Sequence, residues 1–330
     1  MQPMFLTLED GKVFEGRSVD GALECGGLLS FYTGVVGYQE VVTDPANIGK
    51  IVLFTYPLIG NYGVNHEDAE SASPKVEGVI VREYTPYYSN FRAERSLGDY
   101  LQSAGIVFGG CFDTRAILLH LRENGEMMAV TSASRIQPGE LSERIAALTP
   151  RGYNPENSPL DCESALVNAR VVDLGASKSF YRRIAELGVR CCAESDPADV
   201  TLVTDCPYRA VEDDAVLKRV AGYVGQNPTI GFGNGAALIA RACGVQTARM
   251  KFGHHGVNVP VRFLGGGRNE ITIQNHNYGV SPTGEAEPLF ENLHDGTCEG
   301  FACRSARAVG INFVPGPDWF RVALNAVGVN

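Results

Sequence analysis

Residues 229–244 read TIGFGNGAALIARACG, and this stretch indicates a short buried strand that turns directly into a helix. The apolar TIGFG part is too short for a helix, whereas AALIARACG continues with helix-forming residues. Glycines at 231, 233 and 235 lie at the junction, where a tight turn favours residues without a side chain. A strand that leads straight into a helix is the repeating unit of α/β domains.

The residues before this stretch repeat the same alternation. Strand-like segments are ARVVDLG (169–175), VRCCAES (189–195) and DVTLVTD (199–205), and helix-like segments are SKSFYRRIAELG (177–188) and DDAVLKRVAGYVGQ (213–226). Short turns between them predict an α/β fold with a mostly parallel sheet flanked by helices. From Gln246 onward the sequence reads β-rich.

The first 150 residues have a different character. MFLTLEDGKVFEG (4–16) indicates a hairpin around Asp10-Gly11, and residues 28–43 and 50–60 are rich in β-branched and aromatic residues. SLGDYLQSAG (96–105) and TRAILLHLRENG (114–125) have helical periodicity, and each ends on a glycine suited to a helix C-cap. We therefore expect a β-rich domain over 1–150, a proline-bearing linker over 151–165 and the α/β domain over 166–330.

Composition limits the possible functions. The 330 residues are 44% hydrophobic and 20% charged, with no apolar run near the roughly 18 residues that span a bilayer. The start, MQPMFLTLEDGKVFEG, has no basic-then-apolar leader, so we expect a cytoplasmic protein. A formal net charge of −10 argues against nucleic acid as a partner, since phosphate neutralisation needs basic patches.

The nine cysteines are odd in number and scattered, and no two of them form C-x-x-C. Their spacing argues against both a zinc site and a disulfide framework. We expect reduced and mostly buried thiols.

Six segments taken together resemble one family. They are TGVVGYQEVVTDP (33–45), LFTYPLIGNYGVN (53–65), SNFRAERSL (89–97), FDTRAILLHLRENG (112–125), MKFGHHGVNVPV (250–261) and QNHNYGV (274–280). The first four resemble the N-terminal domain of the carbamoyl phosphate synthetase small subunit, and the last two resemble its class I glutamine amidotransferase domain. The resemblance covers nearly the whole chain, in the expected order.

This resemblance implies a heteromer with a large subunit. In the family the small subunit hydrolyses glutamine, and ammonia passes through a tunnel to the large subunit. There two ATP and bicarbonate are used to make carbamoyl phosphate, for arginine or pyrimidine biosynthesis. ATP and Mg are thus expected on the partner, and no cofactor is expected on this chain.

The family's catalytic residues are missing at the matching positions. Its cysteine nucleophile lies in a motif close to G-I-C-L-G-H-Q, which aligns with residues 231–237 and places Gly233 at the nucleophile. Its late H-P-E motif aligns with residues 310–318, where Val314 and Gly316 are the degenerate positions. The last histidine of the chain is His294, so the expected C-terminal base is absent.

The glutamine pocket is altered as well. The family's N-G-P-G turn aligns with residues 205–208, its leucine and glutamine near the nucleophile with Asn234 and Ala237, and a serine with Ala46. Asn275 is retained, and Tyr278 replaces a phenylalanine. The vestigial pocket is thus Ala46, Cys206, Tyr208, Asn234, Ala237, Asn275, Asn277 and Tyr278.

Other signals have simpler interpretations. Cys206 is the best replacement nucleophile, with His276 or the His254–His255 pair as its base, but a rebuilt site is the less favoured hypothesis. The G-x-G-x-G at 231–235 could hold a phosphate, although relief of backbone strain explains it more simply. His254 and His255 are adjacent, so on a strand they face opposite sides and cannot share a metal, and we expect no metal site.

Two remaining motifs favour structural roles. In Asp113-Thr114-Arg115 we expect a buried ion pair or hydrogen bond, and Arg182 and Arg183 fit the solvated face of a helix. Cys243 is expected to pack inward from the helix that follows Gly233.

Three functional hypotheses follow. In the first, the chain is a non-hydrolysing structural or regulatory partner of an ammonia-using large subunit. In the second, it is a stand-alone module that binds a small molecule in a vacated glutamine pocket. In the third, it serves a related ATP-grasp ligase with a different carbamoylated or amidated product.

Overall fold

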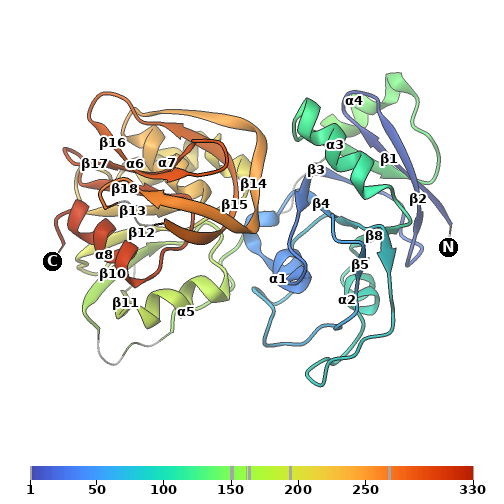
Figure 1. The fold of residues 1–330 in the computed structure, drawn as a ribbon, viewed down its shortest axis with the longest axis horizontal. Helices are drawn as coiled ribbons and strands as arrows, with labels where there is room; N and C mark the ends of the chain where they lie inside the picture. Colours follow the sequence, from blue (N-terminus) through green and yellow to red (C-terminus); the bar gives the residue numbers. More distant parts are fainter. Residues whose placement is uncertain are drawn as a thin grey trace. The chain divides into compact units, whose positions relative to one another are not determined.

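The computed structural model describes residues 2–148, 152–160, 162, 165–192, 195–266 and 269–329. The chain divides into two compact units, Met1–Tyr153 and Asn154–Asn330 (Figure 1). Of the expected linker 151–165, residues 151, 161, 163 and 164 lie outside the described residues.

The first unit is built around a closed barrel with the strand order β1-β2-β8-β6-β4-β3-β9. These strands are β1 (Pro3–Leu8), β2 (Val13–Ser18), β3 (Cys25–Tyr32), β4 (Lys50–Phe54), β6 (Gly78–Ile80), β8 (Val107–Gly110) and β9 (Met128–Ser132). The predicted hairpin is confirmed, because β1 and β2 pair antiparallel with Thr7 opposite Val13. A separate small sheet joins β5 (Leu58–Ile59) to β7 (Glu83–Tyr84).

Helices α2 (Leu97–Ser103), α3 (Thr114–Asn124) and α4 (Pro138–Ala146) accompany this barrel, with a 3-10 turn at Pro45–Asn47. The predicted glycine ends are confirmed: Gly105 follows the C-cap of α2 at a φ of 68°, and Gly125 caps α3 at a φ of 97°. Asp113 caps the start of α3 by accepting a hydrogen bond from the Ala116 N–H (3.0 Å). The motif thus makes a hydrogen bond, as expected, but this hydrogen bond is exposed and not buried.

Residues 38–43 differ from the strand-like interpretation, because they form a short helix, α1 (Tyr38–Thr43). The hydroxyl of Tyr62 accepts hydrogen bonds from the N–H groups of Gly37 (2.8 Å) and Tyr38 (3.0 Å) and so fixes the start of the helix. Tyr38 stacks on Tyr62 with ring centroids 4.0 Å apart. These tertiary contacts outweigh the strand preference of the two valines in the segment.

The second unit contains one nine-stranded sheet with the order β11-β10-β12-β13-β18-β17-β15-β14-β16. Its strands are β10 (Val167–Val172), β11 (Val189–Cys192), β12 (Val200–Val203), β13 (Thr229–Phe232), β14 (Gln246–Phe263), β15 (Asn269–Ser281), β16 (Ala286–Asn292), β17 (Cys298–Cys303) and β18 (Ala308–Ile311). Strands β11, β10, β12, β13 and β18 are parallel, as the alternating pattern predicts. The β-rich remainder continues the same sheet with antiparallel strands.

Helices α5 (Lys178–Glu186), α6 (Asp214–Ala221), α7 (Asn234–Ala242) and α8 (Pro317–Ala326) flank this sheet, with a 3-10 turn at Tyr208–Val211 (Figure 1). The chain order reverses after β11, so right-handed crossovers place α5 and α6 on opposite faces. Phe180 of α5 and Trp319 of α8 share one apolar core with Phe232 and Phe290 of the sheet. Arg182 and Arg183 are exposed, as expected.

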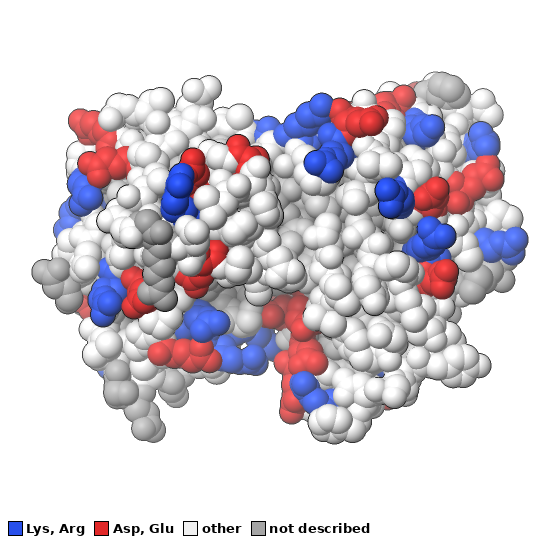
Figure 2. Space-filling model, viewed as in Figure 1, with Lys and Arg blue, Asp and Glu red and all other residues white. Residues whose placement is uncertain are grey.

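Charged side chains of both signs are mixed on the surface of the protein. On the faces drawn in Figure 2, lysine and arginine side chains are interspersed with aspartate and glutamate. Among the residues that the structure describes, no helix combines the length and apolar character that crossing a bilayer requires.

Candidate functional site

The candidate site lies at the carboxyl ends of two neighbouring parallel strands, β12 and β13. In their register, Val203 lies opposite Gly231, so the chain two residues further on brings Asp205 beside Gly233. The carboxyl edge of a parallel sheet is where α/β proteins place their sites.

Gly233 joins β13 to α7 in a conformation that few residues adopt, with a φ of 54° and a ψ of −131°. Its N–H is held by the carbonyl of Ile311 at 2.9 Å. A Cβ added there would lie 2.4 Å from Cγ of Asp205 and 2.6 Å from each carboxyl oxygen. The Asp205 carboxyl group therefore occupies the space in which a side chain at position 233 would begin.

Two backbone N–H groups hold the Asp205 carboxylate in this place. Its Oδ1 accepts a hydrogen bond from the N–H of Asn234 at 2.8 Å and another from the N–H of Cys206 at 2.7 Å. The first donor belongs to the first turn of α7, where the helix dipole favours a negative charge. One N–H group from the start of α7 and one from the segment after β12 converge on this carboxylate, and two such donors form an anion hole of the kind that stabilises oxyanions.

The other two glycines of the turn have steric explanations. A Cβ at Gly235 would lie 2.3 Å from the carbonyl oxygen of Thr204, and one at Gly231 would lie 2.6 Å from the carbonyl oxygen of Gly235. Both positions need glycine because backbone segments approach closely. The G-x-G-x-G pattern is thus accounted for by packing, which favours the structural interpretation over a phosphate-binding turn.

Asn234 is fully buried and links three parts of the unit. Its Nδ2 donates to the carbonyl of Cys206 at 2.9 Å, and its Oδ1 accepts from the N–H of Asn277 at 3.1 Å. The Asn277 amide lies 3.3 Å from Nε2 of His255, whose Nδ1 lies 2.8 Å from the Asn275 side chain. Four of the predicted pocket residues therefore meet in one hydrogen-bond network, which stabilises the turn.

The remaining pocket positions are buried. Ala237 lies in α7 at 1% exposure, and Tyr208 is stacked by the Arg249 guanidinium, 5.6 Å from its ring centre. Tyr278 donates its hydroxyl proton to Glu212 at 2.7 Å, and burial together with this carboxylate raises the pKa of Tyr278. Ala46 belongs to the first unit, where its N–H bonds to a neighbouring aspartate.

The segment matched to the base motif follows β18. Val314 is 44% exposed, and Gly316 is the N-cap of α8. Between them and β18, Asn312 is buried and donates its amide proton to Glu299 at 3.1 Å. The positions expected for the base and its orienting group thus carry no ionisable side chain.

Cys206 follows β12 at the turn and Cys243 caps the far end of α7, and these two thiols differ in burial. Cys206 is fully buried, so its sulfur is closed to a solvent-borne substrate in this conformation. Cys243 is half-buried at the end of α7, and burial raises its pKa to about 12.

A polar group separate from the turn lies across β14, β15 and β17. Oε1 of Glu299 lies 2.8 Å from Nδ1 of His254, and its Oε2 lies 3.2 Å from Nε2 of His276. Glu299 has no exposed surface; burial acts to raise its pKa, but the two histidines outweigh this and lower it. Burial opposes the charge of His254, whereas Glu299 and Asp295 raise its pKa.

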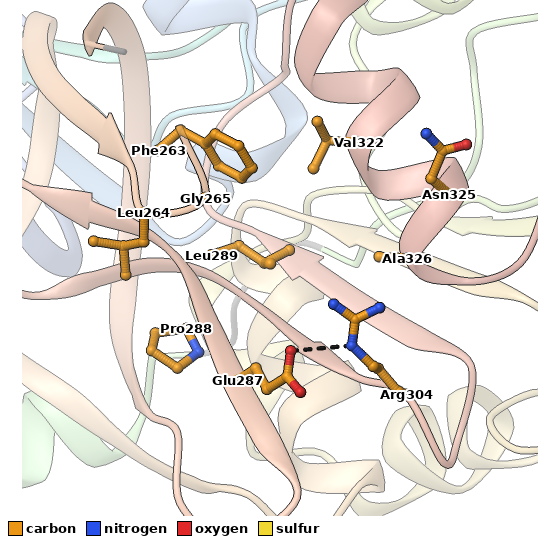
Figure 3. A pocket seen from close by; sticks show the side chains of 10 residues that line it. All are labelled: Phe263, Leu264, Gly265, Glu287, Pro288, Leu289, Arg304, Val322, Asn325 and Ala326. Carbon is orange, nitrogen blue, oxygen red and sulfur yellow. Dashed lines mark hydrogen bonds and ion pairs between the residues drawn. The ribbon is translucent and has the colours of Figure 1, made fainter. Parts of the chain in front are cut away.

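A groove of about 430 Å³ lies elsewhere on the unit, against α8 (Figure 3). Phe263, Leu289 and Val322 form its apolar wall, and Glu287 pairs with Arg304 at 3.0 Å along one side of it. None of the residues predicted for the site lines this groove.

The chain joins a barrel domain to an α/β domain with a strained turn at the carboxyl edge of its sheet, and two family models give the class of each domain. Residues 206–315 match the family model described as glutamine amidotransferase class-I, and residues 6–131 match that of the carbamoyl-phosphate synthase small chain, CPSase domain.

Full-length similarity narrows this to one family. The chain is 37% identical to the carbamoyl phosphate synthase small chain of Nitratidesulfovibrio vulgaris, over 94% of this chain and 92% of that protein. It is 34% identical to the small chain of Clostridium perfringens, over 94% and 93%. The pyrimidine-specific small chain of Lactiplantibacillus plantarum is 35% identical, over 94% and 90%. The chain belongs to the carbamoyl phosphate synthase small chain family.

Sequence reasoning gave no role to Asp205, Glu212 or Glu299, although Asp205 lies in the segment matched to the family's N-G-P-G turn. Asp205 follows a buried strand at the carboxyl edge, and that position is a usable signal for a site residue. Glu212 and Glu299 gave no such signal, because their partners are fixed only by the tertiary structure.

Proposed function

We propose that this chain is a small-chain subunit that does not hydrolyse glutamine and that pairs with a carbamoyl phosphate synthase large subunit supplied with free ammonia. The ATP, Mg and bicarbonate chemistry belongs to that partner. This chain contributes structure or regulation to the complex, and arginine and pyrimidine biosynthesis both stay open as its pathway.

One observation carries this proposal: the Asp205 carboxyl group occupies the place of a nucleophile's side chain at Gly233. Acyl transfer from glutamine needs a nucleophile at the turn and an empty anion hole for the developing oxyanion. Glycine supplies no nucleophile, and a carboxylate in the hole would repel an oxyanion. The two differences reinforce each other, since the space left by the missing side chain is filled by a charge of the wrong sign.

Two further observations support the proposal. Residues 310–318, which are matched to the family's H-P-E motif, contain no histidine that could serve as the catalytic base. The replacement nucleophile considered from sequence, Cys206, is fully buried, and its N–H and carbonyl are both engaged at the turn. These contacts favour a structural role for Cys206 over a role as a reactive thiol.

The small-molecule module is less well supported. That hypothesis needs a cavity vacated at Gly233, whereas Asp205 fills the space beside that residue. The same observations support equally a pairing with a related ligase that makes a different product. The product formed by the reconstituted complex distinguishes this hypothesis from the main proposal.

The test is reconstitution with the large subunit from the same organism. Carbamoyl phosphate is measured with ammonium and then with glutamine as the nitrogen source. We expect product from ammonium, a stable complex on gel filtration, and no product from glutamine. Equal rates from the two sources contradict the proposal, and a matched small chain with an intact cysteine motif serves as the positive control.

A further inference from the structure

The group formed by His254, His276 and Glu299 lies outside the turn and has no part in the proposed function. One ligand atom from each residue lies within 4.8 Å of the others, and the three residues come from β14, β15 and β17. His276 and Glu299 are at most 1% exposed, and His254 is 13% exposed. The sequence argument against a metal concerned the adjacent pair His254 and His255, whereas strand register pairs His254 with His276.

Both ring nitrogens of His276 face hydrogen-bond acceptors. Nδ1 lies 3.0 Å from the carbonyl oxygen of Tyr278, so it carries a proton and donates it. Nε2 lies 3.2 Å from Glu299 and 3.3 Å from Oε1 of Gln274, whose amide nitrogen donates to Thr272 instead. A neutral ring would therefore aim a lone pair at two oxygen acceptors, which is unfavourable in a buried site.

His254 is flanked in the same way. Its Nε2 lies 3.0 Å from the Asp295 carboxylate and its Nδ1 lies 2.8 Å from the Glu299 carboxylate. The Asn292 amide, 3.4 Å from Nδ1, donates at 2.7 Å to Glu299. A proton or a cation must therefore lie between the Glu299 carboxylate and each of the two inner nitrogens that face it, Nδ1 of His254 and Nε2 of His276.

Protons on both of these nitrogens would make the two histidines cationic and so meet this need. One divalent cation bound between the three side chains would supply the same charge. We propose that the His254–His276–Glu299 group binds one zinc ion through Nδ1 of His254, Nε2 of His276 and the Glu299 carboxylate. Two histidines and one carboxylate form a donor set typical of zinc. The fourth position falls to the Gln274 side-chain oxygen or to water.

The surroundings have the features that metal ligands require. Each histidine gives its outer N–H to an acceptor, Asp295 for His254 and the Tyr278 carbonyl for His276, which fixes the tautomer that offers the inner nitrogen. Asn292 and Asn312 donate to the two oxygens of Glu299 and so orient the carboxylate. The histidine nitrogens now lie 2.8 Å and 3.2 Å from the Glu299 oxygens. Zinc–ligand bonds of about 2.0–2.2 Å would fit between these atoms after they move only slightly apart.

The expected role of the ion is structural. It would join three strands beside the turn, because His276 precedes Asn277, whose N–H is held by Asn234. Zinc binding would thus stabilise the part of the sheet that supports the Gly233 turn, without taking part in any reaction there.

The test measures metal directly in the purified full chain. Zinc content is determined by mass spectrometry after dialysis against metal-free buffer, and cobalt is then exchanged in for its visible absorption. We expect about one zinc per chain and a cobalt spectrum of four-coordinate type. Glu299→Gln keeps the shape of the side chain and should lower metal affinity by at least about tenfold. His120→Asn, a substitution of a histidine paired with Asp10 in the first unit, should leave metal content unchanged.

A wild-type chain that retains no more zinc than Glu299→Gln, with the same cooperative unfolding, overturns the proposal and assigns the charge to protons. If Glu299→Gln does not fold, the wild-type chain alone decides. A thermal midpoint that rises when zinc is added to chelator-treated protein supports the site, and an unchanged midpoint with no bound zinc overturns it. Neither result depends on whether the chain hydrolyses glutamine.

Discussion

The carboxyl group of Asp205 lies where a side chain at Gly233 would begin, and it accepts hydrogen bonds from the N–H groups of Asn234 and Cys206. The turn thus combines a strained strand-to-helix backbone at Gly233 with an internal ion–dipole contact that fills the space beside it. On the proposed function, this contact stabilises a turn that carries no nucleophile.

Substitution of Gly233 by alanine tests the strain and the space at this turn. A non-glycine residue at a φ of 54° is strained, and its Cβ would collide with the Asp205 carboxyl group. We expect a loss of about 2–4 kcal/mol in the free energy of unfolding, measured with urea. Gly244→Ala is the control: its φ is 72° but nothing lies within 4 Å of the added Cβ, so about 1 kcal/mol should be lost. Equal losses would show that Asp205 does not fill the space.

Asn234→Ala tests the buried network. The substitution leaves the carbonyl of Cys206 and the N–H of Asn277 without their side-chain partner in a buried setting. We expect a loss of about 2–3 kcal/mol in unfolding free energy, measured by denaturant titration. Asn124→Ala, at an exposed position of α3, should change stability by less than about 0.5 kcal/mol. A tolerated Asn234→Ala would mean that the network is not formed.

Tyr278→Phe keeps the aromatic ring and removes one hydroxyl. That hydroxyl donates to Glu212 at 2.7 Å and is part-buried, so we expect about 1 kcal/mol of destabilisation. Calorimetry gives the change in midpoint, and Tyr87→Phe, at a side chain 85% exposed, is the control with no expected change. A more stable Tyr278→Phe would contradict the hydrogen bond to Glu212.

The cysteines should differ in their rates of alkylation. Burial raises the pKa of Cys298 to about 12, so hardly any thiolate exists near neutral pH, whereas Cys111 is exposed. Iodoacetamide followed by peptide mass spectrometry should find Cys111 modified first and Cys298 unmodified in the folded protein. Fast modification of Cys298 would mean that β17 opens readily.

Sequence periodicity was sufficient for the parallel sheet, because each strand and helix of residues 167–242 has a distinct local pattern. It failed at residues 38–43, where valines favour a strand but the Tyr62 hydroxyl and the packing of Tyr38 stabilise a helix. A tertiary contact decided that segment, and such contacts leave no local pattern.

The candidate site was predictable in part. The family resemblance singled out Gly233 together with Cys206, Asn234, Asn275 and Asn277, and the structure joins these last four in one hydrogen-bond network. The place of Asp205 depends on the register between β12 and β13, and the meeting of His254 with His276 depends on the register between β14 and β15. Register is set by packing across the sheet, so single-sequence reasoning could not reach either pair.

The most direct measurement of the central claim is glutamate release from glutamine by the purified chain, alone and with its large subunit. The account predicts a rate equal to that of a heat-denatured blank in both cases. Sustained glutamate release above the blank that disappears in Cys206→Ser would contradict it, because the hydrolysis would then belong to this chain and to a thiol that the structure shows as buried.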